Sequence, residues 1–151
     1  MAADVTNRET VRDALATLLE TALTGSGNPA QAVYAYQVGD FGGRSPVVVV
    51  SSAGSERDHR TMGERYHNFF YLNVYVFVLY ADPGTDWGED NAEDRVDLLE
   101  KEIADVLMDN FSTDDWVYIQ LDGRSVRDSV EIGGQEYIRE VIPVRVEVYD
   151  G

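Results

Sequence analysis

The stretch from Tyr66 to Tyr80 constrains the fold most, because a strand over these residues would be apolar on both faces. Successive side chains of a strand point to opposite sides of its sheet. One side is uniformly apolar and is predicted to face the core: Phe70, Leu72, Val74, Val76 and Val78. The other side is aromatic and amphipathic: Phe69, Tyr71, Asn73, Tyr75, Phe77 and Leu79. Since usual strands have about 5–6 residues, this strand is expected to project beyond its sheet or to bend.

Periodicity along the rest of the chain predicts two helices and five further strands. Apolar residues at helical spacing predict helices over residues 7–24 and 91–110. Capping boxes at Thr6 to Glu9 and at Asp90 to Glu93 mark where they begin. Strand patterns cover residues 32–38, 46–52, 66–80, 116–121, 124–132 and 135–149.

The connections between these elements predict the fold class. Neighbouring strands without helical crossovers favour a mostly antiparallel or mixed sheet, with the two helices packed on one face. Gly133-Gly134 predicts a two-residue hairpin turn before the last strand. Pro143 cannot donate a ladder hydrogen bond, so that strand should lie at an edge or beside a bulge there. We expect a single α+β domain over residues 1–151.

Residues 53–65 do not fit either periodicity. They are polar, charged and contain Gly, and they predict a long irregular loop between two strands. The segment carries Arg57, Arg60 and Arg65 in an otherwise acidic chain. Such a loop is expected either to dock on an acidic neighbour or to be a disordered surface segment.

The charge of the chain excludes some functions. The net charge is −16, from 28 acidic and 12 basic residues, and Lys101 is the only lysine. Self-repulsion at this charge opposes compaction in dilute buffer, but the Debye length falls to about 3 Å in 1 M salt. This lysine-poor, acidic composition resembles that of proteins from extreme halophiles. It argues against a nucleic-acid reader, which usually has a basic face. Neither a membrane-length apolar run nor a signal peptide is present, so a soluble product made in the cytoplasm is expected.

No motif indicates catalysis, a metal or a cofactor. Asp58 and His59 lie near Ser55, so the three residue types of a hydrolytic triad occur close together in the sequence. However, triads are recognised by geometry and not by closeness in the sequence, and charged side chains of a solvated loop are the simpler interpretation. Asp82, Asp86 and Glu93 partly match a calcium loop. However, that loop requires Gly at the position of Trp87, and acids at a helix N-terminus are the better interpretation. The absence of cysteine removes disulfides and thiolate chemistry. A protein that is not an enzyme is therefore expected.

The aromatic side of the strand at residues 66–80 has two interpretations. Loops or the other hairpin could cover it within the chain. Alternatively it is a subunit interface, since Tyr and Phe are enriched in interface cores and monomers seldom expose large apolar patches.

The order and texture of the elements resemble the tail terminator proteins of long-tailed viruses, a family that includes tail-completion and head–tail joining proteins. The resemblance rests on the N-terminal helix, the long aromatic strand, the amphipathic helix AEDRVDLLEKEIADVLMDN and the closing hairpin that ends in VIPVRVEVYD. It implies a structural virion protein, made in the host cytoplasm, whose hexameric ring at the tail–neck junction caps the tail tube and joins it to the head connector. It implies as partners other copies of the chain, the tail tube protein and the connector, with genomic DNA only in transit and no membrane. The charge then suggests a virus of a halophilic archaeon.

The resemblance also implies which residues make contacts. The subunit-interface candidates are Phe69, Tyr71, Asn73, Tyr75 and Phe77. The docking-loop candidates are Arg57, Asp58, His59, Arg60 and Arg65. Two other classes remain open: another neck or tail-tube component of such a virion, and a free-standing acidic α+β binding module of a halophile.

Overall fold

The computed structural model describes residues 5–61, 65–80 and 89–150. Within β2, β3 and α2 it does not describe the side chains of residues 59–61, 65 and 89–90. The elements in chain order are α1 (Arg8–Leu23), β1 (Ala32–Tyr34), β2 (Val47–Thr61), β3 (Arg65–Leu79), α2 (Glu89–Asp109), β4 (Tyr118–Leu121), β5 (Val126–Ile132) and β6 (Gln135–Tyr149). The expected α+β class and the expected element order are confirmed.

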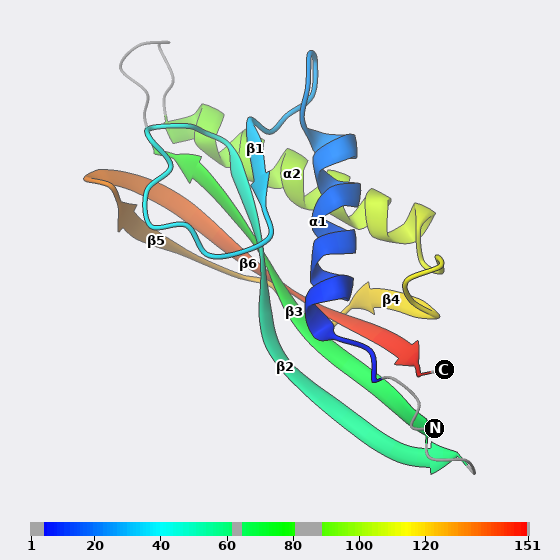
Figure 1. Cartoon of the computed structure of the whole chain (residues 1–151). Helices are drawn as coiled ribbons and strands as arrows, with labels where there is room; N and C mark the ends of the chain where they lie inside the picture. The colour runs from blue at the N-terminus through cyan, green and yellow to red at the C-terminus, as the bar shows by residue number, and fades with distance from the viewer. Residues whose placement is uncertain (1–4, 62–64, 81–88, 151) are drawn as a thin grey trace.

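The sheet is mixed and mostly antiparallel (Figure 1). Its strands follow the order β1-β2-β3-β6-β4, and β5 also pairs with β6. Among the described strands, only the short pair β1–β2 is parallel. β3 pairs with β6 along nearly its whole length, and β5 and β4 follow one another along the opposite edge of β6. The two longest hairpin-like pairs, β2–β3 and β5–β6, extend past the helices at opposite ends (Figure 1).

Both helices pack on one face of this sheet and enclose the main core. α1 lies against β1 and β2, and α2 lies against β3, β4 and β6. The apolar side of β3 predicted to face the core is buried there, each residue no more than 1% exposed: Phe70, Leu72, Val74, Val76 and Val78. Burial of a large apolar side chain contributes about 1.5–3 kcal/mol, so this layer stabilises the fold substantially. Of the described helices, neither is long and apolar enough to cross a membrane.

A second, smaller core lies on the opposite face of the sheet. The connection 35–46 between β1 and β2 folds back over this face and inserts Phe41. Phe41 packs on Phe77 with ring centroids 4.9 Å apart and meets Tyr137 edge-on at 5.4 Å. Phe77 is consequently only 2% exposed and Tyr137 only 1%. For this half of the aromatic side of β3, the first of the two interpretations is therefore correct: a loop of the same chain covers it.

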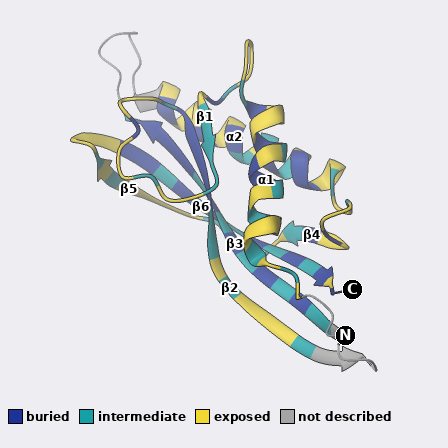
Figure 2. Cartoon of the chain, in the orientation of Figure 1, coloured by how far each residue is buried: buried dark blue, intermediate teal, exposed yellow. Residues whose placement is uncertain are grey.

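The segment 53–65 is a correction to the sequence analysis. It is not an irregular loop, because residues up to Thr61 continue β2 and Arg65 already begins β3. The register shifts between Ser52 and Gly54, so a bulge inserts Ala53. A bulge of one residue reverses which side chains face which side of the sheet. This reversal hid the strand from a period-2 pattern search. Figure 2 shows the outer half of β2 as largely exposed.

Three local predictions can also be checked. The N-cap of α1 is Asn7, whose side chain accepts from the Glu9 amide at 2.9 Å, so the predicted Thr6 cap is wrong. The Gly133-Gly134 turn is confirmed, with φ of +58° and +79°. Pro143 lies in the internal strand β6, at the gap between the part of β6 that pairs with β5 and the part that pairs with β4. Its carbonyl accepts from Asp122 N at 2.8 Å on that side of the strand. The N–H and C=O of one strand residue point to the same side of the strand. The N–H that Pro143 lacks would therefore point to this gap between β5 and β4, so no ladder hydrogen bond is lost.

Candidate subunit interface

The uncovered half of the second sheet face carries the aromatic surface that the sequence singled out. We call it the aromatic strip: Phe69, Tyr71, Asn73 and Tyr75 of β3, with His67 beside them and Arg145 and Glu147 on β6. All seven residues are half-buried. Four of the five interface candidates therefore lie on one accessible surface, whereas Phe77 lies beneath Phe41 and is not available to a neighbouring subunit.

The middle of the aromatic strip is held in place by charged neighbours. Arg145, directly opposite Tyr71 on β6, places its guanidinium 5.6 Å from the centre of the Phe69 ring. The Gln120 side-chain carbonyl accepts from the same guanidinium. The Tyr71 hydroxyl donates to Glu56 Oε2 at 3.3 Å. Burial and the neighbouring Glu56 carboxylate raise the pKa of Tyr71, so its hydroxyl stays protonated at neutral pH.

The outer end of the aromatic strip is a stack of rings. His67 lies parallel to Tyr149 with ring centroids 4.3 Å apart, and it also contacts Phe69 at 4.7 Å. Its Nε2 lies 2.6 Å from Glu147 Oε1. The two charged side chains of the strip, Arg145 and Glu147, thus each have a hydrogen-bond partner within the chain, which lowers the cost of covering them with another protein surface.

The inner end of the strip joins the covered core. Tyr75 stacks on Phe77 at 6.0 Å and has the Arg139 guanidinium 5.8 Å from its ring centre. Arg139 is itself held by Asp128 of β5, with Nε 2.9 Å from Oδ1. The buried Phe77 and the half-buried Tyr75 thus form one continuous packed surface, and contacts within the chain hold Tyr75 in place.

The docking-loop candidates do not form a basic loop. Arg57 is turned toward the helix side of β2, where it donates to Asn68 Oδ1 at 3.1 Å and to the Thr6 carbonyl at 2.8 Å. Its guanidinium also lies 5.0 Å from the centre of the Phe70 ring. Arg57 therefore has a structural role within the chain, and its docking role stays a prediction. Asp58 lies on the opposite side of β2, and the side chains of His59, Arg60 and Arg65 lie outside the described residues.

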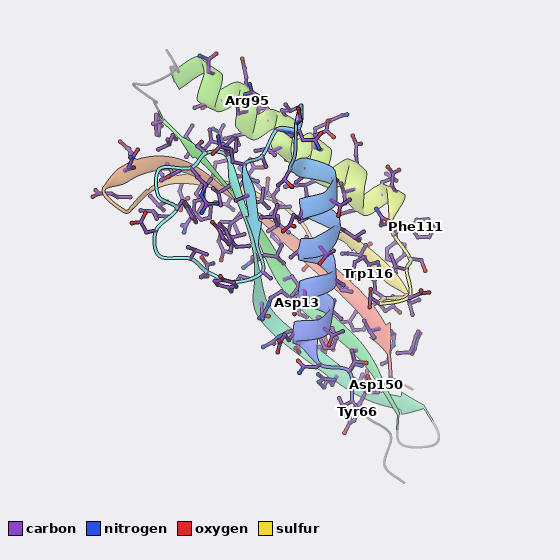
Figure 3. The ribbon with its side chains drawn as sticks, turned by 45° about the horizontal axis from the view of Figure 1, so that its top comes forward. Asp13, Tyr66, Arg95, Phe111, Trp116 and Asp150 are labelled. Atoms are coloured by element: carbon purple, nitrogen blue, oxygen red, sulfur yellow. The ribbon has the colours of Figure 1, made fainter. Side chains whose placement is uncertain are left out.

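Arg57 belongs to a polar cluster that the sequence analysis missed. Asn68 is fully buried and donates to Asp150 Oδ1 at 2.7 Å. Asp150, only 4% exposed, also accepts from the Thr6 amide at 3.0 Å. This terminal cluster ties the segment before α1 to the end of β6, and Figure 3 shows Asp150 and Tyr66 close together at that end. No local signal could reveal it, since its partners are 82 and 144 residues apart.

A hydrolytic site at residues 55–59 is contradicted by the register. Ser55 faces the helices and its Oγ accepts from Arg8 at 2.8 Å, whereas Asp58 is on the other side of the strand. The calcium-loop candidates Asp82 and Asp86 lie outside the described residues, and Glu93 pairs with Arg127 at 2.8 Å. In the described part of the chain, no group of three or more acidic or histidine side chains is placed to hold a metal ion.

One buried acid stands out on the helix side of the sheet. Glu140 of β6 is 5% exposed beneath α2, and its Oε2 has no hydrogen-bond partner among the described residues. Burial raises the pKa of Glu140, Glu100 and Asp97 add to that increase, and Arg127 opposes it. Glu140 and the core residue Ile138 are two positions apart on β6, so their side chains lie on the same side of the strand. The alternation of β6 could therefore have predicted that Glu140 is buried.

We expect Glu140→Gln to stabilise the protein at neutral pH by about 1 kcal/mol. A raised folded pKa means that the destabilisation by Glu140 is absent below the unfolded pKa, grows as pH rises toward the folded value and is complete above it. Urea unfolding across pH 4–8 in molar salt should show the stability difference from wild type growing with pH. Glu136→Gln, an exposed glutamate on the same strand, is the control. A variant no more stable than wild type at pH 8 would contradict the burial of Glu140.

No protein-family model matches this chain, and no curated protein matches its sequence. A functional proposal therefore depends on the fold, the aromatic strip and the charge of the chain.

Proposed function

We propose that this chain is a structural virion protein, one subunit of a homomeric ring, hexameric in the form we favour, at the tail–neck junction of a long-tailed virus. In this proposal the ring caps the tail tube, ends its growth and joins it to the head connector. The single observation that carries the proposal is the aromatic strip. A half-buried, ring-rich face whose charged side chains are hydrogen-bonded within the chain has the composition of an interface core, where aromatic residues and Arg are enriched.

The long β2–β3 pair supports an assembly role. β1 covers β2 only from Val47 to Val49, so the outer part of β2 has no strand on its far edge in the described residues. This pair extends beyond α1 in Figure 1. Its strand β3 contributes most residues of the aromatic strip, and β6 contributes Arg145 and Glu147. β6 pairs with β3 from His67 to Leu79, so the edge of this projection that lacks a partner is the outer edge of β2. A strand edge of this kind readily pairs with another chain. A neighbouring subunit seated on it would supply the missing contacts.

The charge of the chain suits a channel through which DNA passes. A net charge of −16 per subunit repels phosphate, so a lumen built from these subunits would not retain the genome. In this proposal the partners are other copies of the chain, the tail tube protein and the head connector, in a virus of a halophilic archaeon. Molar salt would screen the repulsion between subunits.

The proposal predicts that changes on the aromatic strip disrupt assembly without unfolding the subunit. Tyr71→Ser combined with Tyr75→Ser should weaken subunit association, since buried interface tyrosines contribute about 2 kcal/mol each, about thirtyfold in the dissociation constant. Light scattering after size exclusion in molar salt measures the mass, and circular dichroism checks the fold. Tyr36→Ser, at a tyrosine 61% exposed on the covering connection, is the matched control. Unchanged mass of the double variant would contradict the role of the strip.

A further inference from the structure

A second surface, separate from the aromatic strip, lies where α2 ends beside β4. A groove of about 200 Å³ runs between the last turns of α2 and the edge strand. Its lining is mostly apolar, with the Tyr118 hydroxyl and the Gln120 amide as polar side-chain groups: Ala104, Leu107, Met108, Phe111, Tyr118, Ile119, Gln120 and Leu121. Several of these side chains are unusually exposed for their type, with Met108 at 75%, Phe111 at 55% and Tyr118 at 43%.

Hydrogen bonds and ring contacts fix the connection between α2 and β4 that shapes the groove. Trp116 is buried and its indole N–H donates to the Asn110 carbonyl at 2.9 Å. The Thr113 amide donates to the Trp116 carbonyl, and the Phe111 and Tyr118 rings lie 6.1 Å apart. Figure 3 shows Phe111 directed outward past the end of α2, whereas Trp116 lies close against the ribbon. The exposed rings are therefore held at the rim by a fixed connection.

One wall of the groove is the outer edge of the sheet, which the backbone at Phe111 covers at Ile119. β4 is the last strand of the order, and Ile119 directs its N–H away from β6, to the Phe111 carbonyl at 2.9 Å. Alternate residues of a strand direct their N–H groups to the same side, so Leu121 also presents its N–H outward. Natural edge strands are protected by charge, by proline, by being very short or by a covering segment. β4 has only four residues, and Phe111 covers it at Ile119, so Leu121 marks its uncovered part. Charge and proline add no protection here, because the sequence of β4 is YIQL.

The charge around the groove indicates what it would bind. The chain between Lys101 and Arg124 contains six acidic residues and no basic residue: Glu102, Asp105, Asp109, Asp114, Asp115 and Asp122. The last turn of α2 contains no base, although the partial negative charge at a helix C-terminus favours one. The segments that form the groove thus carry an excess of acids, which we call the acidic rim, although Asp105 already pairs with Lys101 at 2.7 Å. Together with the apolar floor and the helix end that lacks a base, this charge fits a partner that supplies both apolar and basic side chains.

We propose that this groove binds an extended segment of a different protein, which pairs with the outer edge of β4 at Leu121, beyond the hydrogen bond between Ile119 and Phe111. Because strand residues alternate in direction, every second side chain of that segment would be apolar and enter the groove. Lysine or arginine would occupy positions that reach the acidic rim. Strand addition of this kind takes affinity from main-chain hydrogen bonds and specificity from alternate side-chain pockets. This inference holds whether or not the chain forms a ring.

A second copy of the chain is a poor occupant. It would bring 28 acids against 12 bases to an already acidic rim. Most of its described arginines are also engaged within their own chain: Arg8, Arg12, Arg57, Arg127, Arg139 and Arg145.

The test is a selection from a displayed library of random twelve-residue peptides, in about 0.5 M salt to suppress non-specific charge binding. The expected result is enrichment of peptides that alternate apolar residues with Lys or Arg. These should bind the double variant Phe111→Ser, Leu121→Ser at least tenfold more weakly than wild type. Leu98→Ser, at a leucine 39% exposed elsewhere on α2, is the matched control and should change affinity less than twofold. Hydrogen exchange of the Leu121 amide should slow in the complex.

Three outcomes would overturn the proposal. Enriched peptides that bind the groove variant as tightly as wild type would place them elsewhere on the acidic surface. Enriched peptides without basic residues would contradict the role of the rim. No enrichment, together with self-association that the groove variant loses, would make a second copy the occupant.

Discussion

Replacing the buried Asn68 with leucine is expected to lower the free energy of unfolding by about 3 kcal/mol. A purely hydrophobic argument predicts the opposite, because Asn68 is fully buried on the apolar side of β3. However, its amide joins Arg57 to Asp150, and leucine would leave a buried carboxylate without that donor. Removing one partner of a buried polar network costs much more than the network itself contributes.

The matched control for this change is Asn73→Leu on the same strand. Asn73 is half-buried on the aromatic strip and pairs across β3 and β6 with Pro143. We expect this change to alter the free energy of unfolding by less than about 1 kcal/mol. Urea unfolding of both variants in molar salt measures the difference. Equal effects of the two substitutions, or a stabilising Asn68→Leu, would show that the terminal cluster does not hold the two chain ends together.

Replacing Phe41 with alanine is expected to cost about 3–5 kcal/mol. Phe41 is 2% exposed and contacts Phe77, Tyr137 and Tyr34, so its removal leaves a cavity over the second core. A loss of this size should lower Tm by about 10 °C in a chain of this length. Since Phe41 covers the sheet from the outside, Phe77 and Tyr137 should also become more accessible. Binding of a hydrophobic fluorescent dye should therefore increase.

Phe111→Ala is the matched control for Phe41→Ala. Phe111 is 55% exposed, and its truncation should cost less than about 1 kcal/mol. Calorimetry and dye binding compare the two variants with wild type. A Phe41→Ala protein as stable as wild type, without added dye binding, would show that the connection 35–46 does not cover the sheet.

Patterns within single elements predicted much of the fold. The bounds of β6 agree with the predicted 135–149, because its alternation runs without a break from the Gly133-Gly134 turn. α2 is displaced from the predicted 91–110 by only a residue or two, since its apolar stripe is regular. The core side of β3 was also evident from parity, and burial of that side is confirmed.

The missed features depend on contacts between distant residues or on a broken period. The bulge at Ala53 reverses the parity of β2, so Ser55 and Arg57 face α1 while Glu56 faces the aromatic strip. A search for strict alternation therefore assigned a loop. The cover over Phe77 comes from an irregular connection, which has no period to find. Consequently the sequence identified the aromatic side of β3 but could not show that only Phe69 to Tyr75 remain accessible.

The measurement that tests the proposed assembly most directly is the mass of the wild-type protein in solution. Light scattering coupled to size exclusion, at high protein concentration and in roughly 2–3 M salt, removes most of the repulsion between subunits of charge −16. The proposal predicts a mass about six times that of the 16.9 kDa subunit. A mass of one subunit under these conditions would contradict it.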